Sequence, residues 1–237
     1  MSPSLRRWLA ELIGTYGFVT IGAGTGIVAG SHLGDYGLLG VAIGNGVGLG
    51  VMITTFMAVS GSHFNPAITL SAWIGRKIEA GDAVGYVASQ LVGAVAAGLT
   101  LRVIFADAQW RAANLGAPGL ASGVSAGRGV LVEAIFAFFL AMVIWGTAID
   151  ARAPRMGGLF IGLFVVVGVL AVGPLTGGAF NPARYLGPAL VGGHLHYWWV
   201  YFVGPGIGGA AAGVLYPSLF MDGPPWRRKQ PEPTSPR

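Results

Sequence analysis

Six long apolar runs constrain the fold of this chain more than any other feature of its sequence. They cover, approximately, residues 8–29, 38–59, 84–105, 129–149, 157–172 and 197–219. A helix needs about 20 residues, at about 1.5 Å of rise each, to cross the roughly 30 Å of hydrocarbon in a bilayer. All the runs but the short fifth one reach that length. The pattern predicts an all-α membrane protein with six transmembrane helices.

The composition supports this interpretation. The chain is 54% hydrophobic and 10% charged, with a mean hydropathy of +0.67, whereas soluble domains carry about 25% charged residues. Its 41 glycines favour close helix packing. There is no cysteine, which excludes disulfides and thiolate metal sites. In so apolar a chain we interpret the 14 Lys and Arg residues as topology signals, and we expect no nucleic-acid partner.

The N-terminal segment has the basic flank and apolar stretch of a signal peptide. The stretch is too long, contains Glu11 and lacks a clear small-residue cleavage site, so we expect it to remain as the first span. The basic residues fall unequally on the two sides of the predicted bundle. One side holds Arg6, Arg7, Arg76, Lys77, Arg152, Arg155, Arg227, Arg228, Lys229 and Arg237, and the other holds Arg102, Arg111, Arg128 and Arg184. This asymmetry predicts that both termini are cytoplasmic, in a multi-pass protein of the plasma membrane.

A ten-residue pattern, G-x-x-F-N-P-A-x-x-L, occurs at residues 61–70 and again at 177–186. Glu11 near the start of the first span is likewise echoed by Glu133 near the start of the fourth. We interpret the chain as a duplication of three spans, with repeats at about 6–106 and 128–220. Because three is odd, the second copy enters the membrane from the opposite side, which makes an inverted repeat.

Residues 1–220 are thereby predicted to form a single channel-like domain. The tail at 221–237 is rich in proline and has little to bury, so we expect it to be a disordered cytoplasmic segment. Residues from about 106 to 128 form the longest predicted outside loop.

Each Asn-Pro-Ala motif has the sequence of a helix start, because Asn is a favoured N-cap and proline is tolerated at the first helical position. About ten residues follow Pro66 and Pro182, which corresponds to about 15 Å, or half a bilayer. A single such motif is usually an ordinary cap in a loop. Two copies in inverted halves instead predict re-entrant half-helices that meet at the midplane. Irregular backbone at that depth requires polar partners, so the meeting point should line a polar passage.

The stretches "SGSHFNPAITL" and "FNPARYLGPAL", with "AELIGT" in the first span and "WVYFVGPGIGGA" in the last, resemble the aquaporin, or major intrinsic protein, family. The resemblance covers roughly residues 6–220. It implies a right-handed bundle of six helices and two half-helices, and a passive channel for water and small neutral solutes such as glycerol, urea and ammonia. It also implies a homotetramer with a pore in each protomer, no cofactor and no enzymatic activity.

The resemblance implies roles for particular residues. The two pore motifs are Asn65, Pro66 and Ala67, and Asn181, Pro182 and Ala183; the selectivity filter is Asn45, Val169, Gly178 and Arg184. Helix N-termini carry unpaired N–H groups and about half a positive charge, so their meeting point repels cations and protons. The Asn carboxamides would donate to a passing water, which could then only donate to its neighbours.

Other interpretations of four residues remain open. Arg184 could extend to the outer interface instead of narrowing the pore. Glu11 and Glu133 could relay protons, although the resemblance implies that they brace the re-entrant loops. His63 could ligate a metal, but no second ligand lies at a suitable spacing beside it, so we interpret it as bracing its loop.

The filter residues indicate a mixed selectivity. In the family, strict water channels usually carry a bulky aromatic and a histidine where this chain has Asn45 and Val169, which predicts a wider gap. Glycerol facilitators usually carry an aspartate after the arginine and a proline late in the last span. At the corresponding places this chain has Tyr185, Ala189, Tyr201 and Phe202, nearer the water-channel pattern. A facilitator whose main cargo is glycerol or another uncharged solute, a coupled secondary transporter and a structural junction protein are the alternatives.

Overall fold

The computed structural model describes residues 1–153, 156–221 and 223, and these residues form an all-helical bundle without strands. The α-helices are α1 Pro3–Gly30, α2 Gly37–Ser60, α3 Pro66–Ile74, α4 Ala80–Ile104, α5 Asp107–Ala112, α6 Ala126–Ile144, α7 Gly157–Thr176, α8 Pro182–Gly192 and α9 Val200–Phe220. A 3-10 turn, η1 Asn114–Gly116, and a π turn, η2 Trp145–Ile149, complete the set. The predicted tail lies outside the described residues except for Met221 and Gly223.

The six predicted transmembrane helices are present. Five segments are long and apolar enough to cross a membrane: α1, α2, α4, α6 together with η2, and α7. The sixth, α9, has 21 residues, enough for about 31 Å at 1.5 Å each, although two prolines and five glycines lower its mean hydropathy. The prediction of an all-α membrane fold is confirmed.

The spans were predicted only approximately, and α1, α4 and α6 begin three to five residues earlier than predicted, at Pro3, Ala80 and Ala126. The fifth span does not end at residue 172 but continues to Thr176, with Pro174 inside the helix. The last span begins at Val200, later than predicted, because Tyr197 has a left-handed backbone conformation with φ 55°. Residues 197–199 form a turn instead.

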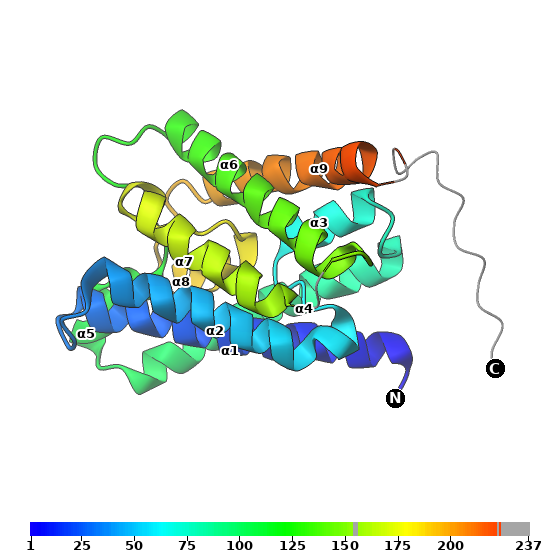
Figure 1. Cartoon of the computed structure of the whole chain (residues 1–237). Coiled ribbons are helices and arrows are strands. Elements are labelled where there is room, and N and C mark those ends of the chain that lie inside the picture. Colours follow the sequence, from blue (N-terminus) through cyan, green and yellow to red (C-terminus); the bar gives the residue numbers. More distant parts are fainter. Residues whose placement is uncertain (154–155, 222, 224–237) are drawn as a thin grey trace.

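The helices pack as two related halves of opposite direction. Helix α1 packs on α4 as α6 packs on α9, and α3 packs on α9 as α8 packs on α4, while α2 and α7 contact each other. In Figure 1 the two short helices lie in opposite halves of the bundle, with α3 toward the end at which α1 begins and α8 toward the other end. This exchange of partners is the inverted repeat predicted from the sequence.

Glycines allow the closest of these contacts. A Cβ atom on Gly187 in α8 would lie 2.1 Å from the carbonyl oxygen of Ala94 in α4. A Cβ on Gly208 in α9 would lie 2.2 Å from the carbonyl oxygen of Ala134 in α6. Only glycine therefore allows these helix pairs to approach at their present separation.

The predicted outside loop contains ordered structure. Trp110 of α5 is buried, and the guanidinium carbons of Arg102 and Arg111 lie 4.8 and 4.3 Å from its ring. The following turn, η1, lies against α1: a Cβ on Gly116, whose φ is 68°, would be 2.2 Å from the carbonyl oxygen of Ala23. The loop thereby brings the backbone of η1 into contact with α1 and α8.

Candidate functional site

The two re-entrant loops have nearly the same backbone conformation. Gly61 and Gly177 have φ values of 79° and 80°, and Phe64 and Phe180 have φ values of 48° and 51°. The two phenylalanines are left-handed although they are not glycine, which costs energy unless surrounding contacts hold them. Both are fully buried, so tertiary structure holds each loop in the same strained form just before its Asn-Pro-Ala motif.

Glu11 of α1 is the main anchor of the first loop. The side chain is fully buried. Its carboxylate accepts hydrogen bonds from the backbone N–H groups of His63 at 2.9 Å and Phe64 at 2.7 Å, from Ser60 Oγ at 2.7 Å and from Gln90 Nε2 at 2.8 Å. Charged acceptors make the stronger hydrogen bonds of proteins, so Glu11 holds the loop from inside the bundle.

Glu133 of α6 makes the equivalent contacts in the second loop. It accepts from the backbone N–H groups of Ala179 at 3.1 Å and Phe180 at 2.6 Å, and from Thr176 Oγ1 at 2.7 Å. It is also fully buried. The two carboxylates therefore occupy corresponding places in the two halves.

Each Asn-Pro-Ala motif begins a half-helix. Pro66 and Pro182 are the first residues of α3 and α8. Asn65 Oδ1 accepts from the N–H of Ala67 at 2.9 Å, and Asn181 Oδ1 accepts from the N–H groups of Ala183 and Arg184 at 2.9 and 3.2 Å. These are N-cap bonds, so the carboxamide nitrogens are turned away from the helices that they begin.

The two carboxamides form hydrogen bonds between the loops. Asn65 Nδ2 donates to the carbonyl oxygen of Phe180 at 2.9 Å, and Asn181 Nδ2 donates to that of Phe64 at 2.8 Å. A carboxamide nitrogen has two N–H donors. In the described part of the chain each nitrogen uses only one of them, and both Asn residues line a central cavity. The second N–H group of each carboxamide can therefore donate a hydrogen bond to a molecule in that cavity.

The central cavity is narrow, with a volume of about 20 Å³. A single water molecule needs about 10–15 Å³ by the same kind of measure, so the cavity has room for about one water molecule. Its polar lining comes from Asn45, His63, Asn65, Asn181 and Arg184, and its apolar lining from Phe18, Leu49, Ile53, Ile68, Leu140, Ile144, Ile161 and Val165, with Gly178 and Ala179 completing it. The polar groups therefore come from α2, α8 and the two loops, and the rest of the lining is apolar.

Three of the four predicted filter residues meet in this cavity. Arg184 Nε donates to Asn45 Oδ1 at 3.0 Å, and Arg184 Nη2 donates to the carbonyl oxygen of Gly116 at 3.0 Å. Arg184 Nη1 is buried without a protein partner. Gly178 lines the same cavity, whereas Val169 does not line it but lies beside Gly178: a Cβ on that glycine would be 3.2 Å from Val169 Cγ2.

His63 of the first loop lines the same cavity and is held by two side-chain contacts. Its Nδ1 lies 3.1 Å from Thr69 Oγ1, and its ring makes an edge contact with Tyr86 at 5.0 Å between centroids. Among the described residues no group of three or more His, Cys, Asp or Glu side chains is placed to hold a metal.

Several residues of the site were not predicted from the sequence. Ser60 and Thr176 each lie five residues before the Asn of their motif and donate to the carboxylates, so extending the repeat alignment by one residue would have found them. The side chain of Gln90 and the carbonyl of Gly116 carry no such signal, because their contacts depend on tertiary packing. The direct bond between Asn45 and Arg184 also could not be read from residues 139 positions apart.

Comparisons with known proteins agree with this geometry. The family model described as major intrinsic protein matches residues 1–216. Aquaporin TIP4-4 of Zea mays is 41% identical over 226 residues, which are 92% of this chain and 87% of that protein. Aquaporin NIP1-1 of Oryza sativa subsp. japonica is 37% identical over 213 residues, 90% of this chain and 73% of that protein.

A solved structure shows the same fold. The X-ray structure of the aquaglyceroporin from Plasmodium falciparum matches with a TM-score of 0.80 and 21% identity, over 91% of this chain and 96% of that one. The fold and the doubled loop define a membrane channel built as an inverted repeat. The chain belongs to the major intrinsic protein family, whose members here include aquaporins, and it is a passive channel.

Proposed function

We propose that this channel conducts water and, more slowly, small neutral solutes such as glycerol, urea and ammonia, and that it excludes protons and ions. The observation that carries the proposal is the pair Asn65 and Asn181. Their carboxamides lie at the facing N-termini of α3 and α8 and line the same cavity. Neutral molecules that accept a hydrogen bond can pass this point, whereas cations meet two positive helix ends.

Proton exclusion follows from the direction of the hydrogen bonds. A water that accepts from Asn65 and Asn181 has both of its own hydrogens directed to its neighbours in the file. It cannot accept a proton along the chain of waters, so proton hopping is interrupted there. Arg184, buried in the wall of the cavity, adds a full positive charge on the outer side of the same path.

The filter supports a graded preference for small solutes. Asn45, Val169 and Gly178 supply neither an aromatic ring nor a histidine, which leaves room beside Arg184. Each lost hydrogen bond or ring wall shifts a barrier by only about 1–3 kcal/mol. Solutes should therefore pass at measurable rates while water remains faster.

The carboxylates brace the loops in this proposal. The contacts of Glu11 and Glu133 support that role, because each accepts from two loop N–H groups and from the hydroxyl of the last residue of the preceding helix. Neither carboxylate is among the residues that line the cavity, which disfavours the alternative of a proton relay. His63 acts with Glu11 by fixing the first loop beside the passage.

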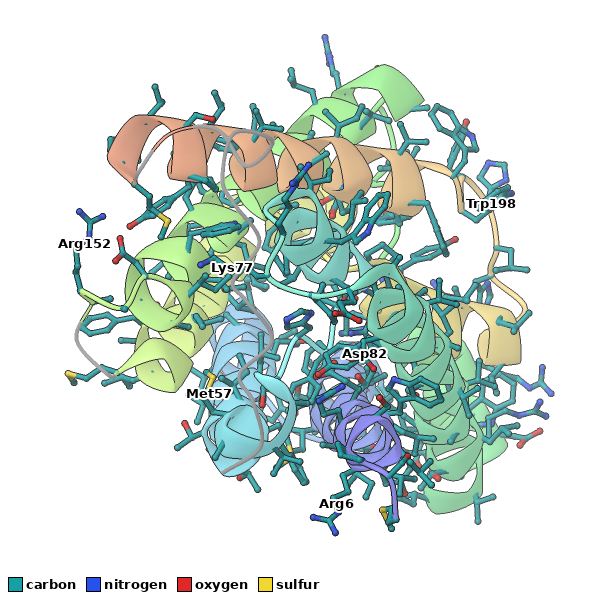
Figure 2. All side chains as sticks on the ribbon, turned by 90° about the vertical axis from the view of Figure 1, so that its right-hand side faces the viewer. Arg6, Met57, Lys77, Asp82, Arg152 and Trp198 are labelled. Carbon is teal, nitrogen blue, oxygen red and sulfur yellow. The ribbon has the colours of Figure 1, made fainter. Side chains whose placement is uncertain are left out.

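The remaining assignments are proposals as well. Residues 1–220 form one channel domain with both termini cytoplasmic, in the plasma membrane, and four copies assemble with a pore in each. The start of α1 and the end of α9 lie at the same end of the bundle (Figure 1). Figure 2 faces this end, where Arg6, Lys77 and Arg152 come from different elements, as the positive-inside rule requires of a cytoplasmic face.

The proposed selectivity is tested by stopped-flow light scattering on proteoliposomes of the purified channel. Osmotic shrinkage in an impermeant solute gives the water permeability, and gradients of glycerol or urea give the solute permeability. We expect both to exceed those of empty vesicles, with water faster. Solute permeability equal to that of empty vesicles, beside high water flux, would refute the wide filter. Solute flux above water flux would instead identify an uncharged-solute facilitator.

A further inference from the structure

We propose that Asn45 is a positioning residue, which holds the guanidinium of Arg184 against the wall of the pore and so sets the clearance for solutes, and that it offers them no hydrogen-bond donor. This inference rests on the proposed function of Arg184 at the constriction. It differs from the usual expectation for a filter residue, in which a polar side chain lining the pore offers hydrogen bonds to the molecule that passes.

The hydrogen bonds of Asn45 leave it no donor for a solute. Its Nδ2 donates to the carbonyl oxygens of Val41 at 2.8 Å and Gly22 at 3.2 Å, and a carboxamide nitrogen has only two N–H groups. The side chain is 5% exposed. These two bonds fix the rotation of the carboxamide, so that Oδ1 points at Arg184 Nε, 3.0 Å away.

Residues of two elements accept hydrogen bonds from the guanidinium of Arg184, and one of its nitrogens has no protein partner. Asn45 on α2 accepts from Nε, and Gly116 of η1 accepts from Nη2. Nη1 is buried and has no protein partner, and the residue lines the passage. The bonds to Asn45 and Gly116 therefore hold the guanidinium at the wall of the cavity.

Loss of the Asn45 acceptor should move the arginine into the passage. A buried charged donor without a partner is costly, and molecules in the pore are acceptors that Nε could reach by turning inward. The guanidinium would turn toward them and reduce the clearance. Solutes larger than water should be hindered more than water.

A substitution at Gly22 can disturb the hydrogen bond between Asn45 and Arg184 without changing a residue that lines the cavity. A Cβ on Gly22 would lie 2.4 Å from Asn45 Oδ1 and 3.5 Å from Arg184 Nε, so Gly22→Ala must displace the carboxamide. Gly24 on the same helix provides the matched control. A Cβ there would meet only Leu101 Cδ2, at 3.5 Å, which is an ordinary contact distance.

The test compares Asn45→Leu, which keeps the size of the side chain but removes its hydrogen bonds, with Gly22→Ala and Gly24→Ala. Each purified variant is reconstituted at equal protein density, and urea and water permeabilities are measured by stopped flow. We expect the ratio of urea to water permeability to fall at least about threefold in Asn45→Leu and Gly22→Ala, and to stay unchanged in Gly24→Ala. An unchanged or higher ratio in Asn45→Leu would overturn the proposal.

A double-mutant cycle with Arg184→Ala separates positioning from a general structural effect. If Asn45 acts through Arg184, then Asn45→Leu has no further effect on permeability in the Arg184→Ala background. An equal effect in both backgrounds would overturn the proposal. Should the native channel pass no urea, the proposed solute selectivity fails, but the same cycle read from water permeability alone still decides the role of Asn45. If Asn45→Leu does not fold, the cycle is run with Gly22→Ala.

Discussion

Single side chains set what the narrow part of this channel can exclude. Val169 and Gly178 lie side by side and give the predicted constriction an apolar, ring-free side, while Arg184 supplies the charge. The difference between a water channel and a solute channel of this family therefore comes down, in our account, to a few atoms at one level of the pore.

Replacement of Val169 by histidine should make the channel more selective for water. Val169→His adds a ring and a donor beside Gly178, which lines the cavity, so we expect glycerol and urea permeability to fall more than water permeability. Val167→His, on the same helix but at a side chain that is 56% exposed, is the control and should leave the ratio unchanged. Equal ratios for Val169→His and the native channel would show that a side chain at position 169 does not control selectivity.

Glu133 should contribute to stability through its hydrogen bonds to the second loop. In Glu133→Gln, one acceptor oxygen becomes an NH₂ group that faces backbone N–H donors, so we expect the free energy of unfolding to fall by about 1–3 kcal/mol. Thermal unfolding in detergent measures this as a lower Tm. Glu79→Gln is the control, because Glu79 is exposed and makes no side-chain cap bond at the start of α4. Equal Tm values for the two variants would contradict the bracing role.

At the scale of helices, the sequence predicted most of the architecture because its signals are local. Apolar length predicts the spans, and the Asn cap followed by proline predicts the starts of α3 and α8 at Pro66 and Pro182. The boundaries that were predicted wrongly depend on tertiary contacts and on local backbone conformation, which the sequence pattern does not show. A helix continues through Pro174 when the bundle around it compensates for the lost N–H, and the turn before α9 depends on the left-handed Tyr197.

The candidate site was predictable in part for the same reason. Its motif residues and carboxylates repeat in the sequence, so their equivalence was visible. The hydrogen bonds that hold Arg184 could not be predicted, because Asn45, Gly22 and Gly116 come from three elements that meet only in the folded bundle. The ordered helix α5 within the outside loop was also missed, since it is short and its burial depends on a neighbouring helix.

Close contact between α6 and α9 should tolerate no added side chain. In Gly208→Ala the new Cβ would lie 2.2 Å from the carbonyl oxygen of Ala134, so we expect a loss of about 1–3 kcal/mol of stability from overpacking. Gly206→Ala, two residues earlier in α9, meets nothing within 4 Å and should match the native protein. Thermal unfolding of the two variants decides the point, and equal destabilisation would argue against tight packing at Gly208.

The loop after η2 contains an ion pair, and its arginine also forms a hydrogen bond to the end of α9. Asp150 accepts from Arg152, whose Nη2 donates to the carbonyl oxygen of Phe220 at the end of α9 at 2.5 Å. The hydrogen bonds from Arg152 hold the pKa of the Asp150 carboxyl well below its usual range. The lowered pKa means that the pair stabilises the fold above the unfolded pKa of about 3.9 and that this contribution is lost as the pH falls below it.

Asp150→Asn should therefore lower the Tm near pH 7, and the difference from the native protein should shrink below about pH 4. Asp35→Asn, at an exposed position in the loop before α2, is the control and should show no such pH-dependent difference. Thermal unfolding between pH 3 and 7 measures both variants. A difference for Asp150→Asn that stays constant across this range would mean that ionisation of Asp150 is not involved.

At the scale of the whole molecule, the inverted repeat explains why two half-helices meet head to head. Each half contributes one carboxylate, one strained loop and one Asn-Pro-Ala cap, and the cross-loop bonds of Asn65 and Asn181 join the halves at the centre. Two positive helix ends then face one narrow passage. Our central claim is that this arrangement separates water flow from proton flow.

Simultaneous measurement of both flows tests that claim most directly. Proteoliposomes of the native channel, loaded with a pH-sensitive dye, are exposed to an osmotic gradient and a pH gradient, and light scattering and dye signal are followed together. We predict rapid water flux with a lower activation energy than that of empty vesicles, and proton entry no faster than in empty vesicles. Proton entry that rises with the amount of channel, or water flux equal to that of empty vesicles, would contradict the account.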